Sequence, residues 1–134
     1  RRAESASFYI YRGGKCMSLS VYLVKRTEPC HCCGHQEEPE YFYTDNTTHN
    51  LGKMADHAGI YKALWRPEEI SIKTANELIP LLESGLVTLK ADPEKFKQYD
   101  APNGWGVYDN LVCFVRDYLE ACKANPEASV EVSR

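Results

Sequence analysis

The chain has 134 residues, of which 43% are hydrophobic, and a formal net charge of −3 at pH 7, which suits a single domain with one core. No apolar run approaches the roughly 20 residues of a membrane span, and the N-terminus lacks the apolar core and cleavage site of a signal peptide. We therefore expect a cytoplasmic protein with no membrane association.

The first sixteen residues are basic, with four Arg or Lys side chains against one Glu. The rest of the chain then has a balance of −6, because the whole chain has −3. Met17 opens "MSLSVYLVKR", which reads like a natural start, so we predict that residues 1–16 are an extension or tag-like tail and that residues 17–134 form one domain. An acidic body without a basic stripe is poorly suited to neutralising phosphates, so nucleic acid is not expected as a partner.

Two strands follow the tail. Leu19, Val21 and Leu23 alternate with other residues in "SLSVYLVKR", which predicts a half-buried strand, and "EYFYTDNT" (residues 40–47) predicts a second one. The residues between them are bounded by prolines and contain Gly34, as expected for the tip of a long hairpin.

This predicted tip contains a Cys/His cluster, "CHCCGH", at residues 30–35. Cys30, Cys33 and Gly34 form a C-x-x-C-G knuckle, in which two thiolates reach one metal ion. Zinc needs two more ligands, and we predict His35 and His49 for them, with His49 folding back along an antiparallel second strand. His31 and Cys32 are the alternative ligands if the turn adopts another register, and zinc is the expected cofactor.

Two other interpretations of the cluster remain open. A redox motif would need the C-x-x-C at the start of a helix in a βαβ unit, whereas "GHQEEP" follows here, so that interpretation is disfavoured. The cysteines would otherwise be unligated surface thiols, which oxidation would threaten.

A polar segment follows the second strand, with Asp45, Asn46, Thr48, His49 and Asn50 at a strand-to-helix junction. Thr48 or Asn50 can cap the helix. A single histidine is more often a structural group than a catalyst, but His49 with Asp45 is the candidate for acid/base chemistry.

The loop "PNGWG" (residues 102–106) carries Trp105. Its indole is expected to cover the edge of the core between two helices. If the ring is instead exposed beside His49, it marks a ligand or partner surface. The predicted ligand-binding residues are Asn46, Thr48, His49, Asn50 and Trp105.

Helical patterns occupy most of the remaining sequence. They predict helices at 51–58, from the capping box of Thr74 and Glu77, from Asp92 and Pro93, and at 108–123. Val130 and Val132 alternate near the C-terminus and predict a third strand that pairs with the hairpin. The expected fold class is α+β, a small antiparallel sheet packed against three or four helices.

Several segments resemble a family of small uncharacterised proteins of bacteriophages and bacteria, namely "NTTHNLGKMADHAGIYKALWRPEEI" with its N-x-T-H-N-L motif, "TANELIPLLESGL", "PNGWGVYDNLVCFV" and "VEVSR". The resemblance extends over nearly all of residues 17–134 and implies one folded unit and a phage or bacterial source. Some of those proteins have no cysteine knuckle, which implies that a metal is an accessory to the fold.

These observations lead to two functional hypotheses. The first is a non-enzymatic binding protein, phage-encoded, with a zinc-stapled hairpin tip and a protein partner. The second is a small hydrolase-like enzyme that uses His49 with Asp45 or with a bound metal.

Overall fold

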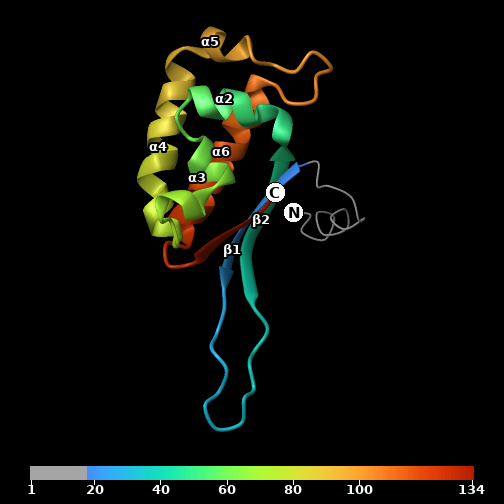
Figure 1. Cartoon of the computed structure of the whole chain (residues 1–134). Coiled ribbons are helices and arrows are strands. Elements are labelled where there is room, and N and C mark those ends of the chain that lie inside the picture. Colours follow the sequence, from blue (N-terminus) through green and yellow to red (C-terminus); the bar gives the residue numbers. More distant parts are fainter. Residues whose placement is uncertain (1–17) are drawn as a thin grey trace.

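The protein has an α+β fold in which a three-stranded antiparallel sheet packs against helices, as predicted (Figure 1). The computed structural model describes residues 18–134. Its strands are β1 (Ser18–Lys25), β2 (Glu40–Thr48) and β3 (Ser129–Ser133); its helices are α2 (Gly52–His57), α3 (Tyr61–Trp65), α4 (Ala75–Ala91), α5 (Pro93–Lys97) and α6 (Tyr108–Ala124), with 3-10 helices η1 (His49–Leu51) and η2 (Pro67–Ile70). The predicted tail, residues 1–16, lies outside the described residues. Within residues 18–134, no helix is both long enough and apolar enough to cross a membrane.

The sheet has the order β2-β1-β3, so β1 is the central strand and β3 pairs with the hairpin as predicted. Val21, for example, lies opposite Asp45 on one side and Val132 on the other. The prediction of a half-buried first strand was too conservative, because Ser20 and Val24 are also buried. A central strand has a neighbour along each edge, which the alternation of β1 alone does not reveal.

The four predicted helices begin within a residue or two of the predicted positions, and α3 is a fifth helix that was not predicted. The N-terminus of α4 is closed by Glu77, whose Oε1 accepts the backbone N–H of Thr74 at 3.1 Å. The start of α5 is capped by Asp92, whose Oδ1 accepts the N–H of Lys95 at 3.3 Å, with Pro93 in the first turn. Pro80 lies inside α4, which nonetheless continues to Ala91.

The core lies between the sheet and the helices. Helix α6 packs on β2, where the rings of Tyr43 and Tyr118 stack with centroids 5.9 Å apart. Helix α4 packs in turn against α6. The largest fully buried side chains include Tyr118, Phe96, Leu19, Leu23, Leu51, Met54, Leu64, Leu78, Leu82, Leu89 and Leu111. The sheet and helices therefore form one continuous apolar cluster.

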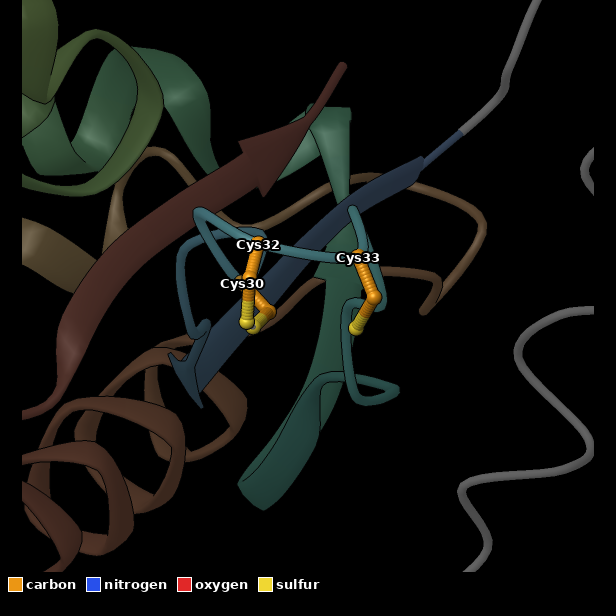
Figure 2. A group of neighbouring side chains, drawn as sticks. All are labelled: Cys30, Cys32 and Cys33. Carbon is orange, nitrogen blue, oxygen red and sulfur yellow. Dashed lines mark hydrogen bonds between the residues drawn. The ribbon is translucent and has the colours of Figure 1, made fainter.

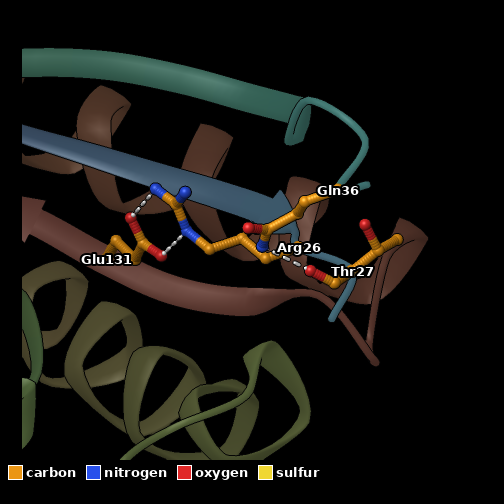
Figure 3. Close-up of polar contacts among 4 residues, drawn as sticks. All are labelled: Arg26, Thr27, Gln36 and Glu131. Carbon is orange, nitrogen blue, oxygen red and sulfur yellow. Dashed lines mark hydrogen bonds and ion pairs between the residues drawn. The ribbon is translucent and has the colours of Figure 1, made fainter. Parts of the chain in front are cut away.

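The connection between β1 and β2, residues 26–39, is here called the arm. It extends well beyond the helices (Figure 1), and none of its residues belongs to the core cluster. At its root, Arg26 forms a bidentate ion pair with Glu131 of β3 through Nε and Nη2 at 2.6 and 2.9 Å (Figure 3). The amide of Gln36 donates to the carbonyl of Thr27 at 2.7 Å, which joins the two sides of the arm.

Candidate functional site

Three thiols converge at the tip of the arm (Figure 2). The sulfur atoms of Cys30, Cys32 and Cys33 all lie within 4.8 Å of one another, and Cys30 Sγ is 3.2 Å from Cys32 Sγ. All three residues are exposed. The predicted pair Cys30 and Cys33 is thus brought together, and Cys32, the alternative in the sequence, joins it as a third potential ligand.

The local backbone explains why the thiols converge. The N–H of Gly34 donates to the carbonyl of Cys30 at 2.9 Å, and the N–H of Cys30 donates to the carbonyl of His35 at 2.7 Å. These bonds close a tight loop. Gly34 has φ +76°, a conformation that L side chains rarely adopt, so the glycine of the knuckle is what allows this turn.

Hydrogen bonds within the same loop lower the pKa of the Cys30 thiol. The backbone N–H of Cys33 donates to its sulfur and, together with hydrogen bonds from the thiol and N–H of Cys32, lowers the pKa of the Cys30 thiol from 9.0 to about 6. At neutral pH Cys30 is therefore mainly a thiolate, the form that binds metals and attacks electrophiles. By contrast, burial raises the pKa of Cys122 in α6 to about 12.

The two predicted histidine ligands are not brought to the thiols. Among the described residues, the group of converging ligand atoms contains neither His35 nor His49. His35 shares the loop, but its ring nitrogens lie outside the group. His49 follows the last residue of β2, whereas the arm precedes the first. A nine-residue strand spans about 30 Å, so His49 is far from the thiols. The antiparallel pairing that suggested a folded-back His49 in fact separates it from the tip.

His49 instead takes part in the packing of η1 on α3. Its Nδ1 accepts a hydrogen bond from the indole Nε1 of Trp65 at 2.9 Å, and Trp65 is buried. A nitrogen that accepts this bond carries no proton and cannot donate one to a carboxylate. The carboxylate of Asp45 accepts from the hydroxyl of Tyr43 at 3.0 Å and the N–H of Asn46 at 2.9 Å. The Nδ1 of His49 is therefore not arranged as the orienting contact of an Asp–His pair.

The strand-to-helix junction is also hydrogen-bonded to the loop of residues 102–106, here called the tryptophan loop. Thr48 caps η1, as predicted, by accepting the N–H of Asn50 at 3.2 Å. The side-chain amide of Asn50 donates to the carbonyl of Trp105 at 2.8 Å, and Asn103 Oδ1 accepts the N–H of Trp105 at 2.9 Å. Both backbone groups of Trp105 are thus held.

The indole of Trp105 does not cover the core. It is 70% exposed, so the expectation of a core-edge tryptophan was wrong and the alternative, an exposed ring beside the junction, holds. Gly104 and Gly106, with φ +77° and +116°, turn the loop so that its backbone approaches Thr48 and Asn50 while the indole remains in solvent.

A groove of about 1010 Å³ lies between the end of β2, the tryptophan loop and α6, and is here called the junction groove. All five predicted ligand-binding residues line it: Asn46, Thr48, His49, Asn50 and Trp105. Asn110, Cys113, Phe114 and Asp117 of α6 also line it and were missed. They fall at i, i+3, i+4 and i+7, one face of a helix, and this spacing is the signal that could have identified them.

Protein-family models, curated proteins and solved structures were each compared with this chain, and none of them matches it. The resemblance to small phage and bacterial proteins therefore stays a prediction.

Proposed function

We propose that this protein is a non-enzymatic binding protein whose arm holds a zinc ion through Cys30, Cys32 and Cys33 and presents the metal-fixed tip to a protein partner. The observation that supports the proposal is the convergence of three thiols within 4.8 Å in a closed loop. The lowered pKa of Cys30 supports it further, because metal ligation requires thiolates.

The donor set fits zinc. Soft thiolates select Zn²⁺ and a few other soft ions, and structural zinc sites are tetrahedral, with Zn–S bonds of about 2.3 Å. Three thiolates provide three of the four ligands. His31 lies between Cys30 and Cys32 in the sequence, and His35 lies two residues beyond Cys33, so either could complete the set by a change of side-chain rotamer. The ion would act as a staple, since the arm contributes nothing to the hydrophobic core that stabilises the rest of the chain.

The shape of the arm suggests a protein partner. It projects from the body (Figure 1), and Tyr41 and Phe42, next to its root on β2, are 52% and 40% exposed. Aromatic side chains are enriched in protein interfaces. Reduced thiols suit the cytoplasm, and a phage source, suggested by the resemblance, fits a small protein that binds a host or viral macromolecule.

The metal can be tested by elemental analysis of the full chain after purification without chelators. Wild-type protein is expected to carry zinc in a stoichiometric amount, and Cys33→Ser is expected to lose it. Cys113→Ser is the matched control, because Cys113 is an exposed thiol on α6, outside the cluster, and this variant should retain zinc. Equal metal content in wild type and Cys33→Ser would refute the site.

The partner can be tested with the same proteins. A binding partner captured by wild type should be lost when residues 27–38 are replaced by a short Gly-Ser turn, while the fold of the body is retained. Capture that is unchanged by the replacement would show that the arm is not the contact surface.

A further inference from the structure

We propose that the junction groove is a carbohydrate-binding site that takes a neutral oligosaccharide, with the indole of Trp105 as the platform on which a sugar ring stacks. This inference goes beyond the proposed function. It concerns the end of β2 opposite the arm and requires no metal.

The platform is an indole on a fixed backbone. The side chain of Trp105 is 70% exposed, but its backbone is fixed. The backbone N–H of Trp105 donates to Asn103 Oδ1 at 2.9 Å, and its backbone carbonyl accepts from Asn50 Nδ2 at 2.8 Å. A large apolar ring in water is costly unless something covers it. Sugar rings present an apolar C–H face that fits flat on an indole, and a fixed loop lowers the entropy lost when a ligand binds there.

The groove around the platform offers both donors and acceptors. Asn103 and Asn110 use their Oδ1 atoms, which accept from Trp105 N–H at 2.9 Å and Val107 N–H at 3.0 Å, so each keeps an NH₂ group that makes no other hydrogen bond among the described residues. Asn50 uses its Nδ2 and keeps its Oδ1 as an acceptor. Hydroxyl groups both donate and accept, so a polyol matches this mixture of amide donors and acceptors.

The charges of the groove argue for a neutral ligand. Two of its lining residues, Asp45 and Asp117, are acidic, and none of the described lining residues is Lys or Arg, which disfavours phosphates and other anions. Among the described lining residues, a cationic ligand is matched by only one unpaired charge, because Asp117 is already paired with Arg116 and both oxygens of Asp45 already accept a hydrogen bond. Asp45 accepts from Tyr43 and Asn46, and Asp117 Oδ1 lies 3.4 Å from Arg116 Nε.

The size of the groove suggests more than one sugar ring. Its volume of about 1010 Å³ is at the upper end of the roughly 300–1,000 Å³ typical of small-molecule sites. Phe114 of α6 also lines the groove, but it is buried, so Trp105 is the exposed aromatic platform. A chain of several sugars could therefore stack on Trp105 and continue toward α6.

Tryptophan fluorescence can test the proposal directly. The chain has two tryptophans, and Trp65 is buried whereas Trp105 is exposed, so a stacked sugar should change the emission of Trp105. The probes are the hexasaccharides of glucose in α-1,4 and β-1,4 linkage, of β-1,4-mannose and of β-1,4-N-acetylglucosamine, each titrated against the full chain. At least one is expected to bind saturably with a Kd of about 1 mM or tighter.

Variants distinguish stacking from other causes. Trp105→Ala, followed by calorimetry, should abolish binding, and Trp105→Phe should weaken it by about tenfold. Val87→Ala, which truncates another exposed apolar side chain, and Cys33→Ser, which disables the arm, should both bind as wild type does. Retained binding in Cys33→Ser also separates this proposal from the zinc proposal.

Three outcomes would overturn the inference. The first is no saturable binding of any of the four hexasaccharides, and the second is binding that Trp105→Ala leaves unchanged. The third is a fluorescence response to oligolysine that is stronger than the response to every sugar, which would identify the groove as a cation site.

Discussion

The buried indole of Trp65 and the ring of His49 are joined by an N–H···Nδ1 hydrogen bond of 2.9 Å. The bond connects η1 to α3, sixteen residues along the chain. Among the described residues, it is the only hydrogen bond that the Trp65 side chain makes, so its acceptor matters for the packing of that region.

We predict that His49→Ala destabilises the protein by about 1–3 kcal/mol, because a buried N–H loses its acceptor. Trp65→Phe removes the donor and some packing. The double variant should then cost less than the sum of the single ones, and urea unfolding of all four proteins measures this coupling. Strictly additive effects would show that the hydrogen bond adds nothing to stability.

We predict that, in protein stripped of metal by a chelator, Cys30 is the most readily alkylated thiol of the described chain at mildly acid pH. Its rate of modification by iodoacetamide should rise with a midpoint near its pKa of about 6, because the thiolate reacts. Buried Cys122, with a pKa of about 12, should stay unmodified in the folded protein. Peptide mapping by mass spectrometry at a series of pH values resolves the individual sites, and a midpoint near 9 for Cys30 would contradict the loop geometry.

The cap of α4 should make stability depend on pH. The backbone N–H groups of Lys73 and Thr74 donate to Oε1 of Glu77 at 2.7 and 3.1 Å and lower its pKa below the usual 4.5. A lowered folded-state pKa contributes stability above the unfolded-state pKa, and this contribution is lost as the pH falls through the folded-state value. Glu77→Gln should therefore be less stable than wild type at neutral pH, and urea unfolding should show the difference shrinking in acid. A difference independent of pH would exclude the charged cap.

Two glycines provide a matched pair of substitutions. A Cβ on Gly85 of α4 would overlap Cγ2 of Ile60, so Gly85→Ala should destabilise by about 1–3 kcal/mol through overpacking. A Cβ on Gly52 would meet Tyr61 Cε1 at an ordinary 3.5 Å, with φ −60° already helical. Gly52→Ala should therefore be neutral or stabilising by up to about 1 kcal/mol. Thermal unfolding of both variants tests the contrast, and equal effects would contradict the close contact between α4 and Ile60.

Local signals predicted the elements well. Thr74 with Glu77, and Asp92 with Pro93, specify helix starts within four residues, so neighbouring residues contain the information needed. The third strand followed in the same way from Val130 and Val132. The α+β fold was predictable because the strands and the longest helices each have a clear period.

Long-range contacts set the limit of prediction. The loop of Trp105 is fixed by Asn50, 55 residues away, and nothing in "PNGWG" indicates whether its indole faces the core or water. The ligand role of His49 failed for a related reason, since the direction of β2 places it far from the thiols. Cys30 and Cys33 were predictable because their knuckle lies within five consecutive residues. The position of the Cys32 sulfur beside them depends on the backbone conformation of the turn, which the spacing of the cysteines does not specify.

The separation of the arm from the core has an evolutionary consequence. Since none of residues 26–39 belongs to the core cluster, substitutions, shortening or lengthening there are expected to leave the folding of the body largely unaffected. The Arg26–Glu131 pair marks where such changes would have to stop. Selection can therefore act on the tip independently of the scaffold, so that a lineage could gain, lose or exchange its thiol-bearing segment without redesigning the domain that carries it.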